Sequence, residues 1–363
     1  MRLAIDGTPL LGVRTGVGAV VAGLVDDLAT RPDVEIVAYA VTGRSGLVPA
    51  VPVGVRTGKR RIPARVVRRL WEHTDAPRVE YWTGPVDVVH ATNYVAPPSR
   101  APVVVSVYDL TFVHFPEMCT ADTLRYPRLL RRALARGTHV HVTSEFVKGE
   151  VVAEFRVEPE RVACVYPGLG DTGGGDAPRG RRLAGSDCYV LALGTIEPRK
   201  NLPRLVRAFD DVAASHPELT LVVAGPPGWG SEAFEAALDA SRASSRIRRL
   251  GYVSDRDRRD LLAGARAFAY PSVYEGFGFP PLEAMTAGVP VVAGAAGSLP
   301  EVLGDAAILV DPYDVDAIAG ALVSVSADET RRAELVARGT ERVHRYTWPH
   351  ACDEMLALYR SLL

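Results

Sequence analysis

The chain has 363 residues, of which 47% are hydrophobic and 23% charged, a composition typical of a folded protein large enough for two domains. Its 42 Lys and Arg residues nearly balance its 43 Asp and Glu residues, so the net charge gives no indication of a nucleic-acid partner. Four scattered cysteines without a CxxC spacing favour reduced thiols over a zinc site or a disulfide framework. Because the chain also shows no signal-peptide core and no run of ~18 apolar residues, we expect a cytoplasmic protein.

Short apolar, β-branched runs alternate with segments of helical periodicity along the whole chain. Such runs are typical of strands buried on both faces of a parallel sheet. In the first half they lie at 2–6, 35–41, 86–91, 102–109, 138–144 and 161–168. In the second half they lie at 188–195, 219–225, 247–253, 267–272, 289–294 and 306–312.

This alternation occurs twice and predicts two doubly wound, Rossmann-like α/β domains. We place the first domain at 1–170, a Gly-rich linker without periodicity at 171–187, and the second domain at 188–346. The segment 347–363 is expected to form a C-terminal helix that can pack back on the first domain. Ligands of such sheets bind beyond the carboxyl ends of the strands, so we expect the binding site in a cleft between the domains.

A glycine-rich segment, "TGVGAVVAGL" at 15–24, leads into the first helical pattern. Its Gly16 and Gly18 suit a loop that a ligand can approach closely, but they equally suit a tight strand-to-helix turn. The residues alone leave both interpretations open.

Two segments of the first half are rich in arginine, and both have amphipathic helical patterns. Basic amphipathic helices are often solvated faces, but they also contact anionic membranes or phosphorylated acceptors. Segment 56–71 contains Arg56, Lys59, Arg60, Arg61, Arg65, Arg68 and Arg69, and segment 125–136 contains Arg125, Arg128, Arg131, Arg132 and Arg136. We keep peripheral membrane contact as a hypothesis for both segments.

The stretch "LALGTIEPRKNLPRLVRAF" at 191–209 predicts a strand that ends at Gly194, a turn, and a helix with Asn201 as its N-cap. Arg199 and Lys200 would then lie beside free backbone N–H groups at a helix N-terminus. That combination is well suited to a diphosphate, because the helix end favours anions and arginine engages phosphate oxygens bidentately.

A second polar stretch, "VYEGFGFPPLEAMTAGVPVV" at 273–292, places Glu275 in a loop after a buried strand and Glu283 in the first turn of a helix. Carboxylates in these positions can accept hydrogen bonds from the hydroxyls of a sugar or a ribose. Paired acids also occur in glycoside hydrolases, but a hydrolase gives no reason for Arg199 and Lys200.

Two further acidic segments, "DRD" at 255–257 and "DVD" at 314–316, resemble D-x-D metal motifs. Each lies where a helix is expected to begin, so we interpret both as N-caps and first-turn acids and expect no bound metal.

The segment "YPSVYEGFGFPPLEAMTAGVPVV" resembles the E-x7-E signature of retaining glycosyltransferases of family 4, which have the GT-B fold. "GTIEPRKN", "GSLPEVLGDAAILVDP" and "RYTW" extend the resemblance over nearly the whole chain. The resemblance implies transfer of a hexose, of mannose or glucose type, from a nucleoside-diphosphate sugar to an acceptor hydroxyl. The acceptor would be a glycan, a lipid-linked compound or a small molecule, and neither a metal nor a cofactor would be needed.

By matching position, the resemblance also implies roles for individual residues. Arg199 and Lys200 would hold the diphosphate and stabilise the leaving group, and Glu283 would accept from the ribose hydroxyls. Glu275 would orient the donor sugar, and the backbone of Val253 would meet the base. The remaining donor-binding candidates are Gly16, Gly18, Gly194, Gly276, Phe277 and Gly278.

The chain departs from the family pattern at Tyr108-Asp109, where many relatives carry His-Asp near the reacting sugar. A tyrosine is a poor proton acceptor, since its ordinary pKa is about 10. His114 is a candidate to stand in, although a loop histidine is more often solvated, and His90 is a further cleft candidate that equally suits a structural role. In the front-face mechanism inferred for such enzymes, the leaving phosphate takes the proton. Two rival interpretations follow: a protein that binds nucleotide sugar without transferring it, and another GT-B enzyme such as a phosphorylase or an epimerase.

Overall fold

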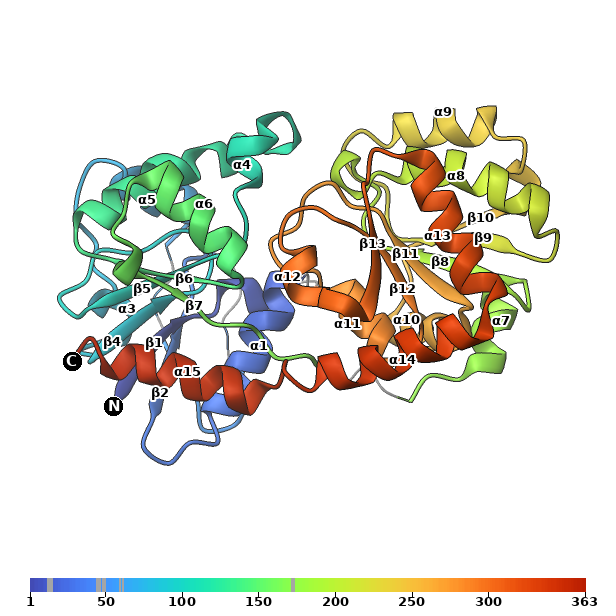
Figure 1. Cartoon of the computed structure of the whole chain (residues 1–363). Coiled ribbons are helices and arrows are strands. Elements are labelled where there is room, and N and C mark those ends of the chain that lie inside the picture. The colour runs from blue at the N-terminus through green and yellow to red at the C-terminus, as the bar shows by residue number, and fades with distance from the viewer. Residues whose placement is uncertain (12–15, 44–46, 48–49, 59, 61, 171–173) are drawn as a thin grey trace. The chain divides into compact units, whose positions relative to one another are not determined.

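The computed structural model describes residues 1–11, 16–43, 47, 50–58, 60, 62–170 and 174–363 (Figure 1). The chain divides into two compact units. Unit 1 contains Met1–Gly170 and Tyr346–Leu363, and unit 2 contains Asp171–Arg345. Lys59 and Arg61 of the first basic segment lie outside the described residues. So do Thr15, the first residue of the glycine-rich segment, and residues 171–173 of the predicted linker.

Unit 1 is built on a seven-stranded parallel sheet of order β3-β2-β1-β4-β5-β6-β7. The strands are β1 (Arg2–Asp6), β2 (Glu35–Tyr39), β3 (Arg56–Thr57), β4 (Val88–Ala91), β5 (Val103–Val107), β6 (His139–Val142) and β7 (Val162–Cys164). The helices are α1 (Gly16–Leu28), α2 (Ala64–Trp71), α3 (Glu80–Thr83), α4 (Thr111–His114), α5 (Tyr126–Ala135), α6 (Glu145–Phe155) and α15 (Trp348–Arg360). The edge strand β3, inside the first basic segment, was not predicted, because a strand of two residues is too short to show a pattern of apolar and polar residues.

Unit 2 is built on a six-stranded parallel sheet of order β10-β9-β8-β11-β12-β13. The strands are β8 (Tyr189–Leu193), β9 (Thr220–Ala224), β10 (Ile247–Gly251), β11 (Ala267–Tyr270), β12 (Val291–Gly294) and β13 (Ala307–Val310). The helices are α7 (Ala177–Ala184), α8 (Leu202–Ser215), α9 (Glu232–Ala240), α10 (Asp255–Gly264), α11 (Phe279–Thr286), α12 (Leu299–Leu303), α13 (Val315–Ala327) and α14 (Glu329–Val343). Two parallel sheets flanked by helices confirm the predicted α/β fold class.

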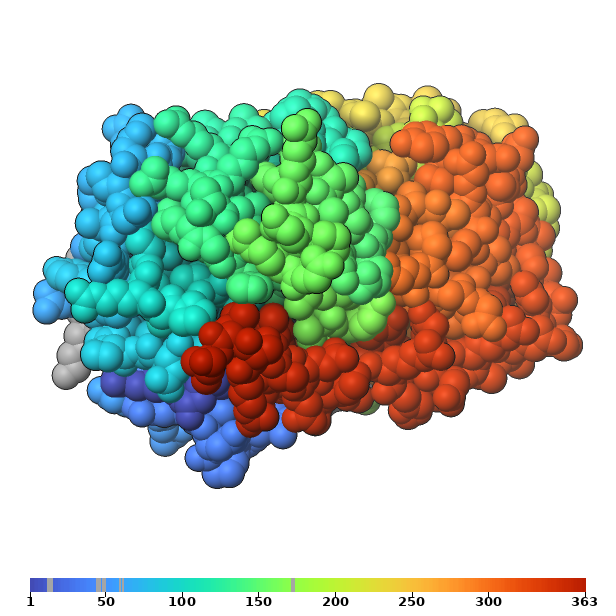
Figure 2. All heavy atoms as spheres, turned by 60° about the vertical axis from the view of Figure 1, so that its left-hand side comes forward, coloured from blue at the N-terminus to red at the C-terminus, as the bar shows by residue number. Residues whose placement is uncertain are grey.

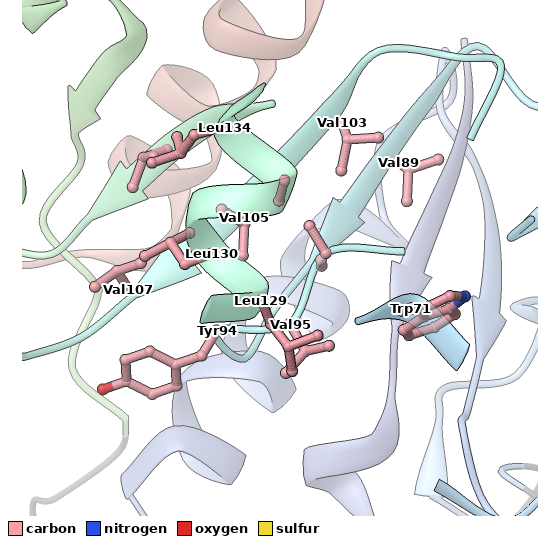
Figure 3. Packing of buried hydrophobic residues seen from close by; sticks show 14 of the residues in the cluster. Trp71, Val89, Tyr94, Val95, Val103, Val105, Val107, Leu129, Leu130 and Leu134 are labelled. Atoms are coloured by element: carbon pink, nitrogen blue, oxygen red, sulfur yellow. The ribbon is translucent and has the colours of Figure 1, made fainter. Parts of the chain in front are cut away.

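The central strands are mostly apolar because helices cover both faces of each sheet. In unit 1, α5 lies across β5, and its leucines pack on the valines of that strand (Figure 3). Leu129, Leu130, Leu134, Val105 and Val107 belong to one buried cluster, which also contains Val103. In unit 2, the predicted stripe of α8 from Leu202 to Ala213 is buried in the same manner.

The predicted linker 171–187 is not irregular throughout, because α7 occupies its centre. Asp176 caps this helix by accepting from the backbone N–H of Arg179, and Gly185 ends it in the left-handed conformation. Asp260 of α10 then accepts from the backbone N–H of Asp176 at 2.7 Å and from the side chain of Arg179. The helix therefore depends on tertiary contacts with α10, which local periodicity cannot reveal.

The C-terminal helix α15 packs on α1, so the last residues of the chain lie against its first ones within unit 1 (Figure 2). Trp348 fits between two glycines: a Cβ at Gly23 would lie 2.1 Å from its ring, and one at Gly168 would lie 2.4 Å from its backbone nitrogen. Only a residue without a side chain allows this approach at either position.

A chain of buried hydrogen bonds links α15 to the sheet of unit 1. The Nε2 of His141 can only donate to the carbonyl of Val165 (3.2 Å), so its Nδ1 accepts from the hydroxyl of Ser106 (2.8 Å). Ser106 therefore accepts from Nε2 of His90 (2.8 Å), and Nδ1 of His90 accepts from the hydroxyl of Tyr359 (2.7 Å). Every member of the chain is satisfied only when both histidines are neutral.

We predict that Tyr359→Phe lowers the free energy of unfolding by about 1–3 kcal/mol, because it leaves Nδ1 of buried His90 without a donor while keeping the ring. Urea unfolding of the full chain, followed by tryptophan fluorescence, measures this change. Tyr313→Phe is the matched control, since Tyr313 is 60% exposed, and it should leave stability unchanged. Equal stability of the two variants would contradict a role for the hydrogen-bond chain.

We also predict that stability falls as the pH drops from about 6.5 towards 4. Burial lowers the pKa of His90 well below its ordinary value, and burial lowers the pKa of His141 to about 4. Both histidines stay neutral in the folded chain but take up protons when it unfolds. Each therefore lowers the free energy of unfolding by up to about 1.4 kcal/mol per pH unit within that window. Urea unfolding from pH 7 to pH 5 measures the slope. Exposed His350 provides the control, since His350→Gln should leave the slope unchanged.

Candidate active site

The candidate site lies at the carboxyl edge of the sheet in unit 2. Strands β8 and β11 are neighbours in that sheet, with Ala267 paired to Val190 and Phe268 to Leu191. Because the strands are parallel, the loops that follow them leave from the same edge. The sheet topology therefore brings the "EPRKN" loop, which follows β8, to the first glutamate of the E-x7-E segment, which follows β11.

Glu275 is the centre of the site. Its side chain accepts from Arg199 Nη1 at 2.7 Å through Oε2 and from Lys200 Nζ at 2.6 Å through Oε1. Lys200 also donates to the hydroxyl of Tyr270 at 2.5 Å, and Arg199 Nε lies 2.7 Å from a carboxylate oxygen of Glu197. The three predicted residues Arg199, Lys200 and Glu275 thus form one network, in which two acids balance two cations.

The electrostatics of this network determine the ionisation of its side chains. Burial would raise the pKa of Glu275, which is 6% exposed, but the charges of Arg199 and Lys200 outweigh burial and lower this pKa to about 2. Burial lowers the pKa of Lys200, which Glu275 partly offsets. Burial, reinforced by the charge of Glu275, raises the pKa of Tyr270 well above its ordinary value, so this phenol stays protonated.

Asn201 does not cap α8 as predicted. Its backbone is left-handed (φ 58°), and its side chain makes no capping hydrogen bond. Instead the buried side-chain amide donates to the carbonyls of Pro271 (3.0 Å) and Pro312 (2.5 Å). Asn201 therefore ties the loop after β8 to the loops after β11 and β13. The one-turn 3-10 helix Pro198–Lys200 presents the two cations. Gly194, at the end of β8, leaves room beside the Lys200 side chain.

The second half of the E-x7-E segment forms α11, with Gly278 at its N-cap. Gly278 has φ 103°, and a Cβ there would lie 2.7 Å from Leu299, so both backbone and space require glycine. Ser298 supports the loop from behind by donating its hydroxyl to the carbonyl of Phe277 (3.1 Å) and its N–H to that of Glu275 (3.0 Å). The contact of Gly276, Phe277 and Gly278 with a donor sugar stays a prediction.

Glu283 lies one turn further into α11 than predicted, because the helix begins at Phe279 and has no acid in its first turn. Residue Glu283 is 8% exposed as a whole. Its carboxylate accepts from Arg258 Nη1 of α10 through both oxygens, at 2.6 and 2.7 Å. Burial raises the pKa of Glu283, and Arg258 opposes that shift. Val253, the predicted neighbour of the base, lies in the loop between β10 and α10.

Both D-x-D-like segments act as helix starts. Ser254 caps α10 by accepting from the N–H of Asp257, whose carboxylate pairs with Arg179 at the start of α7. Asp314 caps α13 by accepting from the N–H of Ala317 at 2.9 Å. These contacts explain both segments, while metal independence itself stays a prediction.

In unit 1, the departure from the family pattern has a structural explanation. Tyr108 donates its hydroxyl to the carbonyl of Thr92 at 2.8 Å, and burial raises its pKa. Asp109 accepts from the N–H of Thr111 (2.9 Å) and from the hydroxyl of Tyr94 (3.3 Å), which anchors the start of α4. The Tyr108 hydroxyl is thus engaged as a hydrogen-bond donor, and the Asp109 carboxylate is engaged by Thr111 and Tyr94. Their catalytic role stays a prediction.

The histidine candidates differ from the expectation in their surroundings. His90 is fully buried within the hydrogen-bond chain that ends at Tyr359, so the interpretation as a site residue is wrong. His114 lies at the end of α4 and its Nε2 is 2.6 Å from a carboxylate oxygen of Glu150. His114 therefore contacts α6 through Glu150. Its role in proton transfer stays a prediction.

The glycine-rich segment begins α1 rather than forming a loop before it, since the helix starts at Gly16. Gly16 is exposed and a Cβ there would meet nothing within 4 Å, whereas Gly18 is buried. Both glycines thus belong to the first turn of a helix, whose free N–H groups suit an anion.

Four supporting residues were not assigned from the sequence: Glu197, Arg258, Tyr270 and Ser298. Two of them carried a readable signal, because Glu197 lies inside "EPRKN" and Tyr270 ends an otherwise apolar strand at the site edge. The other two act across elements that are distant in sequence, and no local pattern indicates their partners.

Comparisons with known proteins identify the family of the chain. Residues 14–170 match the family Glycosyltransferase Family 4, and residues 177–342 match Glycosyl transferases group 1. The O-antigen chain mannosyltransferase B of Escherichia coli is 32% identical over 284 residues, covering 76% of this chain and 74% of that protein. The phosphatidyl-myo-inositol mannosyltransferase of Mycolicibacterium smegmatis is 35% identical over 177 residues, covering 48% of this chain and 45% of that protein.

Solved structures show the same architecture at low sequence identity. The sucrose-phosphate synthase of Thermosynechococcus elongatus aligns with a TM-score of 0.78 at 19% identity, covering 100% of this chain and 99% of that one. HepE of Anabaena, solved in complex with UDP and glucose, aligns with a TM-score of 0.73 at 18% identity, covering 99% of each chain. The chain therefore belongs to glycosyltransferase family 4, the group 1 glycosyltransferases, and has the GT-B fold.

Proposed function

We propose that this protein is a retaining, metal-independent glycosyltransferase that moves a hexose from a nucleoside-diphosphate sugar to an acceptor hydroxyl. The observation that carries the proposal is the network of Arg199, Lys200 and Glu275 at the carboxyl edge of a parallel sheet. Two cations that are already positioned by a buried carboxylate can bind a diphosphate without first reorganising. The preorganisation favours the charged transition state over the ground state.

In the proposed reaction, the bond between the donor's anomeric carbon and the diphosphate oxygen breaks while the acceptor oxygen bonds to the same carbon on the same face. The acceptor's proton moves to the leaving phosphate oxygen, so no protein base is needed. Arg199 and Lys200 stabilise the negative charge that develops on that oxygen. This route is consistent with Tyr108, whose hydroxyl is already committed to Thr92.

The names of the relatives favour mannose as the transferred hexose. Several relatives, including the two described above, are called mannosyltransferases, and several others are called D-inositol 3-phosphate glycosyltransferases. A structural neighbour was solved with UDP and glucose. We therefore propose GDP-mannose as the first donor to test and UDP-glucose as the second. The acceptor class, whether glycan, lipid-linked compound or small molecule, remains part of the proposal.

Peripheral membrane contact is proposed for one face of unit 1 only. Most arginines of the two basic segments are paired: Arg56 with Glu35, Arg68 with Asp122, Arg125 with Glu72, Arg131 with Glu154, and Arg132 and Arg136 with Asp75. In the part of the chain that the structure describes, no helix is long and apolar enough to cross a membrane. The cytoplasmic location stays a prediction.

The exposed face of α2 is the exception. Arg65 and Arg69 are exposed there beside Val66 (50% exposed) and Leu70 (42% exposed), and no acid among the described residues pairs with either arginine. A surface hollow of about 580 Å³ adjoins Val66, Arg69 and Leu70. Alternating cationic and apolar side chains suit the headgroup region of an anionic membrane.

We predict that the protein binds nucleoside diphosphates and that Lys200→Ala weakens this binding about tenfold or more, because it removes a charge-assisted contact. Calorimetric titration with GDP, UDP, ADP and their mannose, glucose and N-acetylglucosamine conjugates measures both. The control is Arg207→Ala, an exposed residue of α8, which should bind like wild type. Lack of binding by every nucleotide would reject the proposed function.

Turnover separates transfer from binding alone. Release of nucleoside diphosphate from the best-bound conjugate, stimulated by an acceptor, would support the transferase. A protein that binds the conjugate but releases nothing with any acceptor class would instead favour the nucleotide-sugar-binding alternative.

We further predict that the double variant Arg65→Glu/Arg69→Glu reduces binding to phosphatidylglycerol vesicles about tenfold or more, since each surface cation contributes about 1 kcal/mol. Vesicle sedimentation at low and high salt measures this, with phosphatidylcholine vesicles as the neutral reference. The control is Arg78→Glu/Arg100→Glu, which reverses two other exposed charges of unit 1. Equal loss in both double variants would reject α2 as the contact face.

A further inference from the structure

Arg258 is held against the acid that the family resemblance assigns to the ribose. It lies one turn inside α10, after the loop that contains Val253, and its Nη1 contacts both carboxylate oxygens of Glu283. Its Nη2 lies 3.6 Å from Asp255, one turn earlier on the same helix. The side chain of Arg258 is one-third exposed, whereas that of Glu283 is 11% exposed.

The geometry of this pair leaves the carboxylate able to bind a second partner. A carboxylate offers about four lone-pair sites, and one bifurcated N–H group on Nη1 uses one site on each oxygen. Each oxygen therefore keeps a site for another donor. Two adjacent hydroxyls, as on the 2′ and 3′ carbons of a ribose, are spaced to donate one hydrogen bond to each oxygen.

The charges around Glu283 make Arg258 necessary for this role. The charged groups that act on its carboxylate are Arg258 and Asp255, both on α10, and Asp255 favours the protonated form. The strands behind α11, β11 and β12, carry no charged residue. Helix α14 packs on α11 at Gly339 and Met285. Arg342 of α14 donates to the carbonyls of Glu301 and Val302.

We propose that Arg258 is a positioning residue of the donor site, which keeps Glu283 ionised and turned so that the carboxylate binds the two ribose hydroxyls. The inference rests on the proposed function, because it requires a nucleotide in this site. Without Arg258, the buried carboxyl group faces only Asp255, so its ionised form loses the cation that opposes the effect of burial and its protonated form, which accepts hydrogen bonds poorly, is favoured. Nucleotide affinity then becomes dependent on pH.

The experiment is calorimetric titration of the full chain between pH 7 and pH 9 with whichever of GDP, UDP and ADP binds best. We expect wild-type affinity to change little over this range. Arg258→Ala should bind about tenfold more weakly at pH 7 and recover as the pH rises to 9, because the carboxyl group of Glu283 then ionises. Arg258→Lys should restore a flat profile, since a cation is present again.

The 2′,3′-dideoxy form of the same nucleotide isolates the ribose contact. It cannot donate to Glu283, so wild type and Arg258→Ala should bind it with equal affinity at every pH. Arg256→Ala, an exposed arginine on the same helix, is the matched control and should behave like wild type. Thermal unfolding of each variant checks that it is folded.

The possible outcomes separate this inference from the proposed function. A wild type that binds no nucleotide rejects both. A wild type that binds, together with an Arg258→Ala variant that binds equally well at pH 7, rejects only the inference. A loss that is the same at every pH and also affects the dideoxy nucleotide indicates general damage to α10 and likewise rejects it.

Discussion

The site depends on one buried carboxylate, Glu275, held between Arg199 and Lys200. A buried charge is costly unless it is paired and hydrogen-bonded, and here both oxygens are paired. The same contact fixes the two cations, whose long side chains would otherwise lose entropy when a ligand ordered them. The network is therefore a mutual arrangement: the acid is stable because of the cations, and the cations are in place because of the acid.

The rest of unit 2 maintains this contact. Parallel pairing of β8 with β11 brings the two loops to one edge, and Asn201 ties them by donating to the carbonyl of Pro271. A second hydrogen bond, to the carbonyl of Pro312, ties in the loop after β13. Ser298 supports the loop of Glu275, and Gly278 allows the chain to turn into α11. Arg258 repeats the same principle at Glu283, where a cation from another element compensates a buried acid. Each acid of the E-x7-E segment thus has its own arginine partner.

Unit 1 uses polar groups differently. Its buried histidines, His90 and His141, are neutral members of a hydrogen-bond chain that attaches α15 to the sheet. A neutral chain avoids the desolvation cost of buried charge, but it requires every donor to meet an acceptor. This requirement explains why the histidines within strands β4 and β6 belong to the core.

The sequence by itself determined the two parallel sheets, the strands with continuous apolar runs and the stripe of α8, and the family resemblance marked Arg199, Lys200 and Glu275 as candidate site residues. These features are local to single elements. The contact of Glu275 with the two cations was decided by the pairing of β8 with β11. Only the tertiary structure decided the helix α7, the role of Asn201, the partner of Glu283 and the pairing of most basic-segment arginines. Each of these depends on the distance between groups from elements far apart in the chain, as between Arg258 and Glu283 or Asp260 and Arg179. Sequence periodicity describes one element at a time, so it carries no information about such distances.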